Sequence, residues 1–261
     1  MTSSLFYHVS GDGQPLVWLH GWGVNGSIFL PTVAQLPQYR SYCVDLPGFG
    51  DSQPQPGTLD DWAERLFEQL PTNAIWLGWS LGGLVATRIA QRWPQQVRGL
   101  VTIASSPRFM AQATPPWPGI AAAIMQQFAE QLQQDLQRTV ERFLALQAMG
   151  SASARDDIRH IKELVLSKPQ PDALALAQGL NMLQQVDLRS DLSLITLPWL
   201  RLWGKLDGLV PRKIATLLPQ TPQSQDIILP KASHAPFISH PEDFLYNLRS
   251  WLQIKGFNSG Q

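Results

Sequence analysis

The chain has 261 residues, and its 20 lysines and arginines are balanced by 20 aspartates and glutamates. A zero formal net charge provides no global field for nucleic acid or an anionic membrane, so we expect neither as a partner. The single cysteine, Cys43, excludes an internal disulfide. The sequence shows no signal peptide and no apolar run that could span a bilayer, so we expect a cytoplasmic, monomeric protein.

Strand and helix patterns alternate over the first hundred residues. The apolar stretches 5–9 and 15–19 flank the turn signal Gly11-Asp12-Gly13, so we expect them to pair as a β-hairpin. The elements predicted next are helix 27–36, strand 41–45, helix 59–70, strand 75–79, helix 84–92 and strand 97–104.

The pattern changes between residues 109 and 185, where strand signals stop and helical periodicity takes over. We interpret 109–185 as a helical lid inserted into a core formed by 1–108 and 186–261. Within the second part of the core, the predicted elements are strand 199–203, helix 212–218, strand 226–229 and helix 241–252. Such alternation predicts an α/β fold with a mostly parallel central sheet and helices on both faces.

The turn Gly78-Trp79-Ser80-Leu81-Gly82 joins a predicted strand to a predicted helix. A Gly-x-Ser-x-Gly sequence at such a reversal places its serine in a strained conformation at the top of the sheet. Glycines on both sides let the strand and the helix approach closely. Ser80 would lie beside helix N-terminal amides, which suits a nucleophile that attacks a carbonyl. The alternative is a glycine-rich turn with an incidental serine.

A serine nucleophile needs a base that removes its proton, and His234 is our candidate. It lies in the loop 231–237, directly after strand 226–229, so it can reach the sheet edge that carries Ser80. We interpret the other histidines differently: His8 lies in the first hairpin, His160 in the insertion, His240 at a helix start, and His20 braces a loop.

The base in turn needs an acid that fixes its tautomer, and Asp207 is our candidate. It follows strand 199–203, and the chain order Ser80, Asp207, His234 is typical of α/β hydrolases. Asp207 could instead be a turn residue that caps the next helix. Of the other aspartates, Asp187 and Asp191 precede the strand at its opposite end, and Asp226 lies within or beside a strand.

Two backbone amides are candidates for binding the negative charge that develops on the attacked carbonyl. One belongs to Leu81, directly after the serine, and the other to Trp22 in the loop His20-Gly21-Trp22-Gly23. No residues have the spacing of metal ligands, and no dinucleotide motif is complete, so we expect no metal or other cofactor.

The turn around Ser80, the loop 20–23 and the segment 44–50 resemble the α/β-hydrolase superfamily. A closer resemblance, to the pimeloyl-acyl carrier protein methyl ester esterases of biotin biosynthesis, rests on the segments 139–147, 206–213 and 234–241. It implies a serine carboxylesterase that converts a carrier-bound pimeloyl methyl ester into the acid and methanol. It also implies a substrate site that contains Trp22, Ser80, Leu81, Phe143, Leu144, Ala145, Leu146, Gln147 and His234.

Paired arginines in the insertion fit an acidic acyl carrier protein as the partner. Arg138 and Arg142 are four residues apart, as are Arg155 and Arg159, so each pair shares a face if its segment is helical. Arginine suits carboxylates and phosphates. The alternative is a set of solvated arginines neutralised within the helices, since 110–185 holds six basic and seven acidic residues.

Three other functions stay open from the residues alone. The same catalytic residues would serve a broad-specificity esterase that acts on small-molecule, short-chain esters, or a hydrolase that cleaves carbon–carbon bonds. A third alternative is a binding protein that keeps the fold without turnover.

Overall fold

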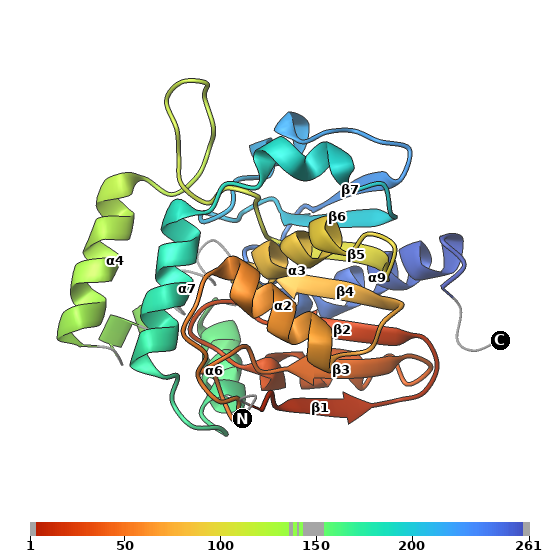
Figure 1. Cartoon of the computed structure of the whole chain (residues 1–261), viewed down its shortest axis with the longest axis horizontal. Coiled ribbons are helices and arrows are strands. Elements are labelled where there is room, and N and C mark those ends of the chain that lie inside the picture. Colours follow the sequence, from red (N-terminus) through yellow and green to blue (C-terminus); the bar gives the residue numbers. More distant parts are fainter. Residues whose placement is uncertain (1–3, 136–137, 140, 143–153, 258–261) are drawn as a thin grey trace.

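The computed structural model describes residues 4–135, 138–139, 141–142 and 154–257. Seven strands from these residues form one sheet with helices on both faces (Figure 1). β1 runs antiparallel to β3, and the other neighbouring pairs are parallel. The predicted α/β architecture is confirmed. In sheet order, the strands are β1 (Tyr7–Ser10), β3 (Arg40–Val44), β2 (Pro15–Leu19), β4 (Ala74–Trp79), β5 (Val97–Ile103), β6 (Trp199–Gly204) and β7 (Ser224–Leu229).

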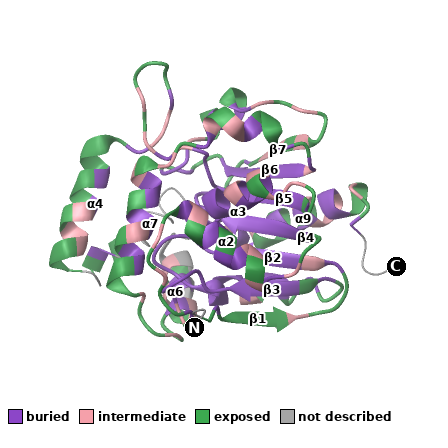
Figure 2. Cartoon of the chain, in the orientation of Figure 1, coloured by how far each residue is buried: buried purple, intermediate pink, exposed green. Residues whose placement is uncertain are grey.

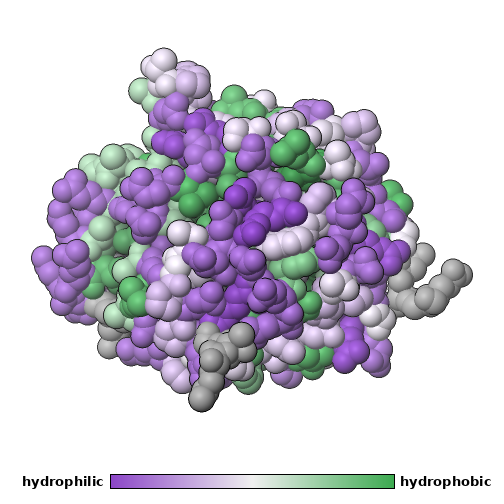
Figure 3. Space-filling view, in the orientation of Figure 1, coloured by the Kyte–Doolittle hydropathy of each residue, from purple (hydrophilic) through white to green (hydrophobic). Residues whose placement is uncertain are grey.

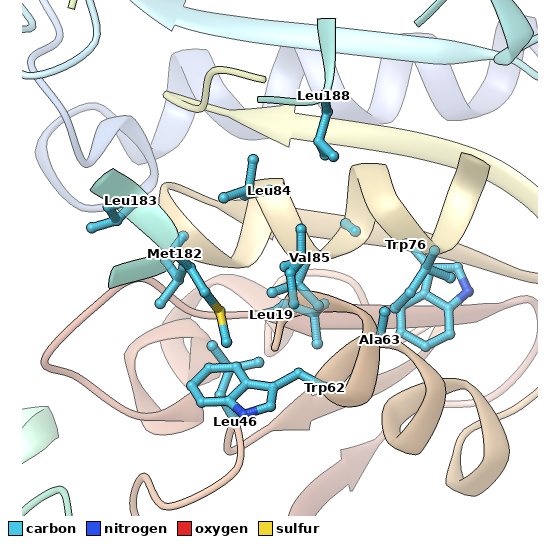
Figure 4. Close-up of a cluster of buried hydrophobic side chains, with 14 of the residues drawn as sticks. Leu19, Leu46, Trp62, Ala63, Trp76, Leu84, Val85, Met182, Leu183 and Leu188 are labelled. Carbon is cyan, nitrogen blue, oxygen red and sulfur yellow. The ribbon is translucent and has the colours of Figure 1, made fainter. Parts of the chain in front are cut away.

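Each face of the sheet has its own apolar core. Trp62 of α2 and Val85 of α3 belong to one core, and Trp251 of α9 belongs to the other. Figure 4 shows part of the first core, which includes Trp62 and Met182 of α7 (Ala173–Gln185). The helices here are α1 (Leu30–Val33), α2 (Leu59–Gln69), α3 (Leu81–Arg92), α8 (Pro236–Ser239) and α9 (Pro241–Ile254), with 3-10 helices η1 (Gly26–Phe29), η2 (Arg189–Leu194) and η3 (Arg212–Leu217).

The start of α2 shows how local sequence fixes a helix. Thr58 accepts a hydrogen bond from the backbone N–H of Asp61, and the Asp61 carboxylate accepts one from the Thr58 N–H. This reciprocal pair satisfies two amides that have no partner inside the helix. Trp62 and Leu66, four residues apart, then face the core.

The predicted hairpin of the first two strands is wrong, because β3 lies between them. Tyr7 of β1 pairs with Val44 of β3, and Leu16 of β2 pairs with Ser41 of β3. The four residues from Leu16 to Leu19 are fully buried, so β2 needs a neighbour on each side, whereas the residues of β1 are mostly exposed at the edge (Figure 2). An unbroken apolar run is typical of an interior parallel strand.

The insertion between β5 and β6 contains α4 (Ala122–Gln134), α6 (Ala154–Val165) and α7 (Ala173–Gln185). An ion pair between Lys168 Nζ and Asp45 Oδ2, at 2.7 Å, joins it to the core. The Asp45 side chain is fully buried and also accepts hydrogen bonds from the backbone N–H groups of Gly26 and Asp51. Removing one partner of a buried pair leaves the other charge uncompensated.

We therefore expect Lys168→Met to lower the free energy of unfolding by about 2–5 kcal/mol, measured by urea denaturation. Lys162→Met is the matched control, because Lys162 forms an exposed pair with Glu141 at 3.7 Å. That variant should lose less than about 1 kcal/mol. Equal losses in the two variants would contradict the structural role of the Lys168–Asp45 pair.

Candidate active site

Ser80 lies at the point where β4 reverses into α3. Its backbone has φ 54° and ψ −119°, which is a strained conformation for a residue with a side chain. The neighbouring glycines make the reversal possible: a Cβ at Gly78 would overlap the backbone of Gly82, and a Cβ at Gly82 would overlap the backbone of Leu19. The serine is therefore held where the chain has no room to relax.

Hydrogen bonds to β5 and to the residues that follow it help to hold the strained backbone. The Ser80 N–H donates to the carbonyl oxygen of Ile103 at 3.0 Å, and Ser105 Oγ donates to the Ser80 carbonyl at 2.7 Å. Ser105 has no role in the sequence prediction. Its position directly after a predicted strand could have indicated that it lies near Ser80, because the carboxyl ends of neighbouring parallel strands meet at one edge of the sheet.

Asp207 and His234 form a buried pair at this edge. His234 Nδ1 lies 2.8 Å from Asp207 Oδ2, and both side chains are almost completely buried. Because a carboxylate only accepts hydrogen bonds, Nδ1 carries the proton, and Nε2 of the neutral ring has a free lone pair. Nε2 has no hydrogen-bond partner among the described residues, so the structure shows no bond between it and the Ser80 hydroxyl.

The second Asp207 oxygen fixes the loop that carries it. Oδ1 accepts hydrogen bonds from the N–H groups of Leu209 at 2.8 Å and Val210 at 3.0 Å. Asp207 is thus both a turn residue and the partner of the histidine. The rival Asp187 lies elsewhere, between Arg108 and Arg189, and the hydrogen bond from Arg189 lowers the pKa of its carboxyl.

His20 braces the glycine-rich loop after β2, as predicted. The backbone N–H of Leu46 donates to His20 Nε2 at 2.9 Å, which leaves Nδ1 as the donor to the Gly21 carbonyl at 2.8 Å. Burial lowers the pKa of His20 from 6.5 to about 4, so the ring stays neutral. This loop adjoins the serine, because a Cβ at Gly21 would lie 3.2 Å from Ser80 Cβ.

Helix α7 packs against both residues whose amides are the oxyanion candidates. The Trp22 indole donates to the Leu176 carbonyl at 2.8 Å. A Cβ at Gly179 would lie 2.9 Å from Trp22 Cδ1 and 3.1 Å from Leu81 Cδ2. Leu81 is the first residue of α3, where an amide has no acceptor within its own helix.

The predicted docking arginines lie on the insertion. Arg138 and Arg142 line a cavity of about 670 Å³ together with Lys162, Asp135 and Glu141. Arg142 also donates to Gln131 Oε1 at 2.8 Å. The exposed Arg159 pairs with Asp156 at 2.9 Å. The predicted substrate residues of the insertion lie outside the described residues; they are Phe143, Leu144, Ala145, Leu146 and Gln147. The side chain of Arg155 is not described either.

The described ranges contain neither a cluster of metal-ligand side chains nor a helix that could span a membrane. No three His, Cys, Asp or Glu side chains are grouped there as metal ligands would be. No helix in those ranges is long and apolar enough to cross a membrane.

Comparison with known proteins assigns the chain to a protein superfamily. The sequence model of the alpha/beta hydrolase fold family matches residues 14–241. An esterase from Exiguobacterium antarcticum superposes with a TM-score of 0.85 at 24% identity, covering 96% of each chain. The esterase RhEst1 from Rhodococcus superposes with a TM-score of 0.76 at 27% identity, covering 96% of this chain and 95% of that one. The chain belongs to the α/β-hydrolase superfamily.

Curated relatives narrow the class to one family. A protein from Shewanella woodyi is 58% identical over 253 residues, covering 97% of this chain and 99% of its own. One from Photobacterium profundum is 50% identical over 256 residues, covering 97% and 100%. Both are named pimeloyl-[acyl-carrier protein] methyl ester esterase. The chain is a member of this esterase family and a carboxylic ester hydrolase.

The low pKa of His20 makes stability depend on pH. Between about pH 4 and 6.5 the unfolded chain binds a proton at this residue that the folded chain does not. Stability therefore falls as the pH decreases through this window, by up to about 1.4 kcal/mol per pH unit.

We expect His20→Gln to have a shallower pH dependence than the wild type over this window, measured by urea denaturation at each pH. His8→Gln, at an exposed position of β1, is the matched control and should keep the wild-type slope. An unchanged slope in His20→Gln would show that the ring at position 20 does not cause it.

Proposed function

We propose that the chain hydrolyses the methyl ester of pimeloyl-acyl carrier protein in biotin biosynthesis, releasing methanol. The relatives' names point to this substrate. The observation that carries the chemistry is the buried Asp207–His234 pair, at 2.8 Å, at the same sheet edge as the strained Ser80. We place the reaction in the cytoplasm, catalysed by a monomer.

In this mechanism Ser80 Oγ attacks the ester carbonyl while His234 Nε2 takes the hydroxyl proton. Asp207 stabilises the resulting imidazolium. The N–H groups of Leu81 and Trp22 bind the oxyanion of the tetrahedral intermediate. Its collapse expels methanol, which receives the proton from His234, and water then hydrolyses the acyl-serine by the same steps. Proton transfer requires about 2.6–3.2 Å between Oγ and Nε2, a contact that often forms only with substrate bound.

We further propose that 109–185 is a lid on a core of 1–108 and 186–261. The contacts of α7 with the side chains of Trp22 and Leu81 support this role, because these are the two residues that carry the candidate oxyanion amides. In this proposal the substrate chain lies between 143–147 of the lid and the residues Trp22, Ser80, Leu81 and His234.

Arg138, Arg142, Arg155 and Arg159 would dock the acidic carrier protein. The exposed positions of Arg138, Arg142 and Arg159 support this proposal, because a partner can reach them. Apolar and hydrophilic patches alternate on this side of the molecule, over α4 and α7 (Figure 3). A mixed surface of this kind suits a transient partner.

Ser80→Ala should abolish both hydrolysis of carrier-bound pimeloyl methyl ester and labelling by a fluorophosphonate probe, since the nucleophile is gone. Ser106→Ala is the matched control, because this buried hydroxyl at the same edge donates to the Arg108 carbonyl. The control should be labelled normally. Labelling that persists without the Ser80 hydroxyl would refute the nucleophile.

Asp207→Asn should lower kcat by about 10⁴ while the protein stays folded. The asparagine oxygen can still accept from Leu209 and Val210, but its amide would donate toward His234 Nδ1 and favour the wrong tautomer. Steady-state hydrolysis is the measurement, and Asp187→Asn is the control that should keep its kcat. A near-normal kcat in Asp207→Asn would place the acid elsewhere.

Arg142→Glu combined with Arg159→Glu should reduce kcat/KM for the carrier-bound ester about tenfold or more, because reversed charges repel an acidic partner. Hydrolysis of a small methyl ester should be unchanged. The control reverses Arg40 and Arg212, two exposed arginines outside the insertion, and should affect neither substrate. An equal loss on both substrates in the first variant would argue against docking and for a general esterase.

A further inference from the structure

Trp79, the residue before the candidate nucleophile, connects β4 to the loop of the candidate base. Its side chain is fully buried, and its indole Nε1 donates a hydrogen bond of 2.7 Å to the backbone carbonyl of His234. The two rings also lie side by side, with centroids 5.6 Å apart. One side chain on a central strand thus holds the main chain of the residue whose imidazole must reach Ser80.

The same indole supports the glycine-rich loop after β2. A Cβ at Gly21 would lie 3.1 Å from Trp79 Cε3 and 3.2 Å from Cζ3, so this glycine rests on the six-membered ring of the indole. The peptide bond that follows Gly21 carries the Trp22 N–H, one of the proposed oxyanion donors. Phe237, three residues after His234, packs edge-on against Trp79 at 5.2 Å.

Buried tryptophans of this sheet differ in whether the indole forms a hydrogen bond: Trp199 and Trp203 of β6 also donate one, to Thr102 and Asp226. Trp76, on the same strand as Trp79, and Trp18, on β2, are also fully buried, yet within the described part of the chain their Nε1 atoms have no hydrogen-bond partner. These two indoles pack in the core without a hydrogen bond. Trp79 adds a directed contact to the loop that carries the candidate base.

We propose that Trp79 is a positioning residue, which sets the distance from His234 to Ser80 and seats the oxyanion loop. This inference rests on the proposed roles of Ser80 and His234. His234 lies outside regular secondary structure, and its carbonyl accepts the hydrogen bond from the Trp79 indole. Displacing a catalytic group by about 1 Å can cost about 10²-fold in rate.

The test compares Trp79→Phe with Trp76→Phe. Both remove an indole of the same size from β4, but only the first removes a hydrogen bond. For each variant we would measure the melting temperature, kcat and KM on the carrier-bound ester, and the second-order rate of fluorophosphonate reaction with Ser80. Trp79→3-benzothienylalanine, which replaces the N–H by sulfur and keeps the ring shape, separates the bond from the packing.

We expect similar losses of melting temperature in the two phenylalanine variants. In Trp79→Phe, kcat and the fluorophosphonate rate should both fall about tenfold or more, with KM within about twofold of wild type. The Trp76→Phe variant should keep wild-type rates, and the benzothienyl variant should show the rate loss at near wild-type melting temperature. Equal rates in both phenylalanine variants, or a benzothienyl variant with wild-type rates, would overturn the proposal.

The fluorophosphonate rate keeps this test independent of the substrate. If the wild type fails to hydrolyse the carrier-bound ester, the proposed function fails, but the reaction of the probe with Ser80 still reports how well base and oxyanion amides are placed. If the wild type hydrolyses the ester and the Trp79 variants match it, the positioning role alone is refuted.

Discussion

The crossing of α3 over the end of β4 determines where every other part of the site must lie. Gly78 and Gly82 allow this crossing because neither has a Cβ to obstruct it, and Ser80 between them takes φ 54°. Strain of this kind costs roughly 1–3 kcal/mol and persists only where the surroundings enforce it. Ser105 provides part of that enforcement through its hydrogen bond to the Ser80 carbonyl. The position of the candidate nucleophile is consequently fixed, and loops from other strands lie around it.

Two buried histidines at this edge show how environment assigns different tasks to one residue type. His20 accepts from one amide and donates to one carbonyl, so both ring nitrogens are used and burial keeps the ring neutral. His234 has a carboxylate at Nδ1, and its Nε2 has no partner in the described structure. A proton on Nε2 of His20 would break the contact with the Leu46 N–H, whereas Nε2 of His234 has no such contact to lose in the described structure.

The sequence predicted the features that depend on local order, and it missed those that depend on distant neighbours. Ser80, Asp207 and His234 could be proposed because each follows a predicted strand, and the carboxyl ends of parallel strands meet at one edge of a sheet. The order of the first three strands could not be read from a turn signal, which is compatible with several pairings. The ion pair of Lys168 with Asp45 joins residues 123 positions apart, and no pattern in either segment indicates the other.

Helix α7 contacts both residues that carry the candidate oxyanion amides, so in the proposed mechanism the insertion would influence the place where negative charge accumulates. Gly179 is the point of closest approach, and even one added methyl group there would press on Trp22. Exchanging this insertion for that of a related hydrolase, in order to change the accepted substrate, would therefore also change the packing against the residues that carry the candidate oxyanion amides. In the proposed mechanism, a change of the insertion would therefore affect both substrate selectivity and kcat, and a redesign has to consider the two together.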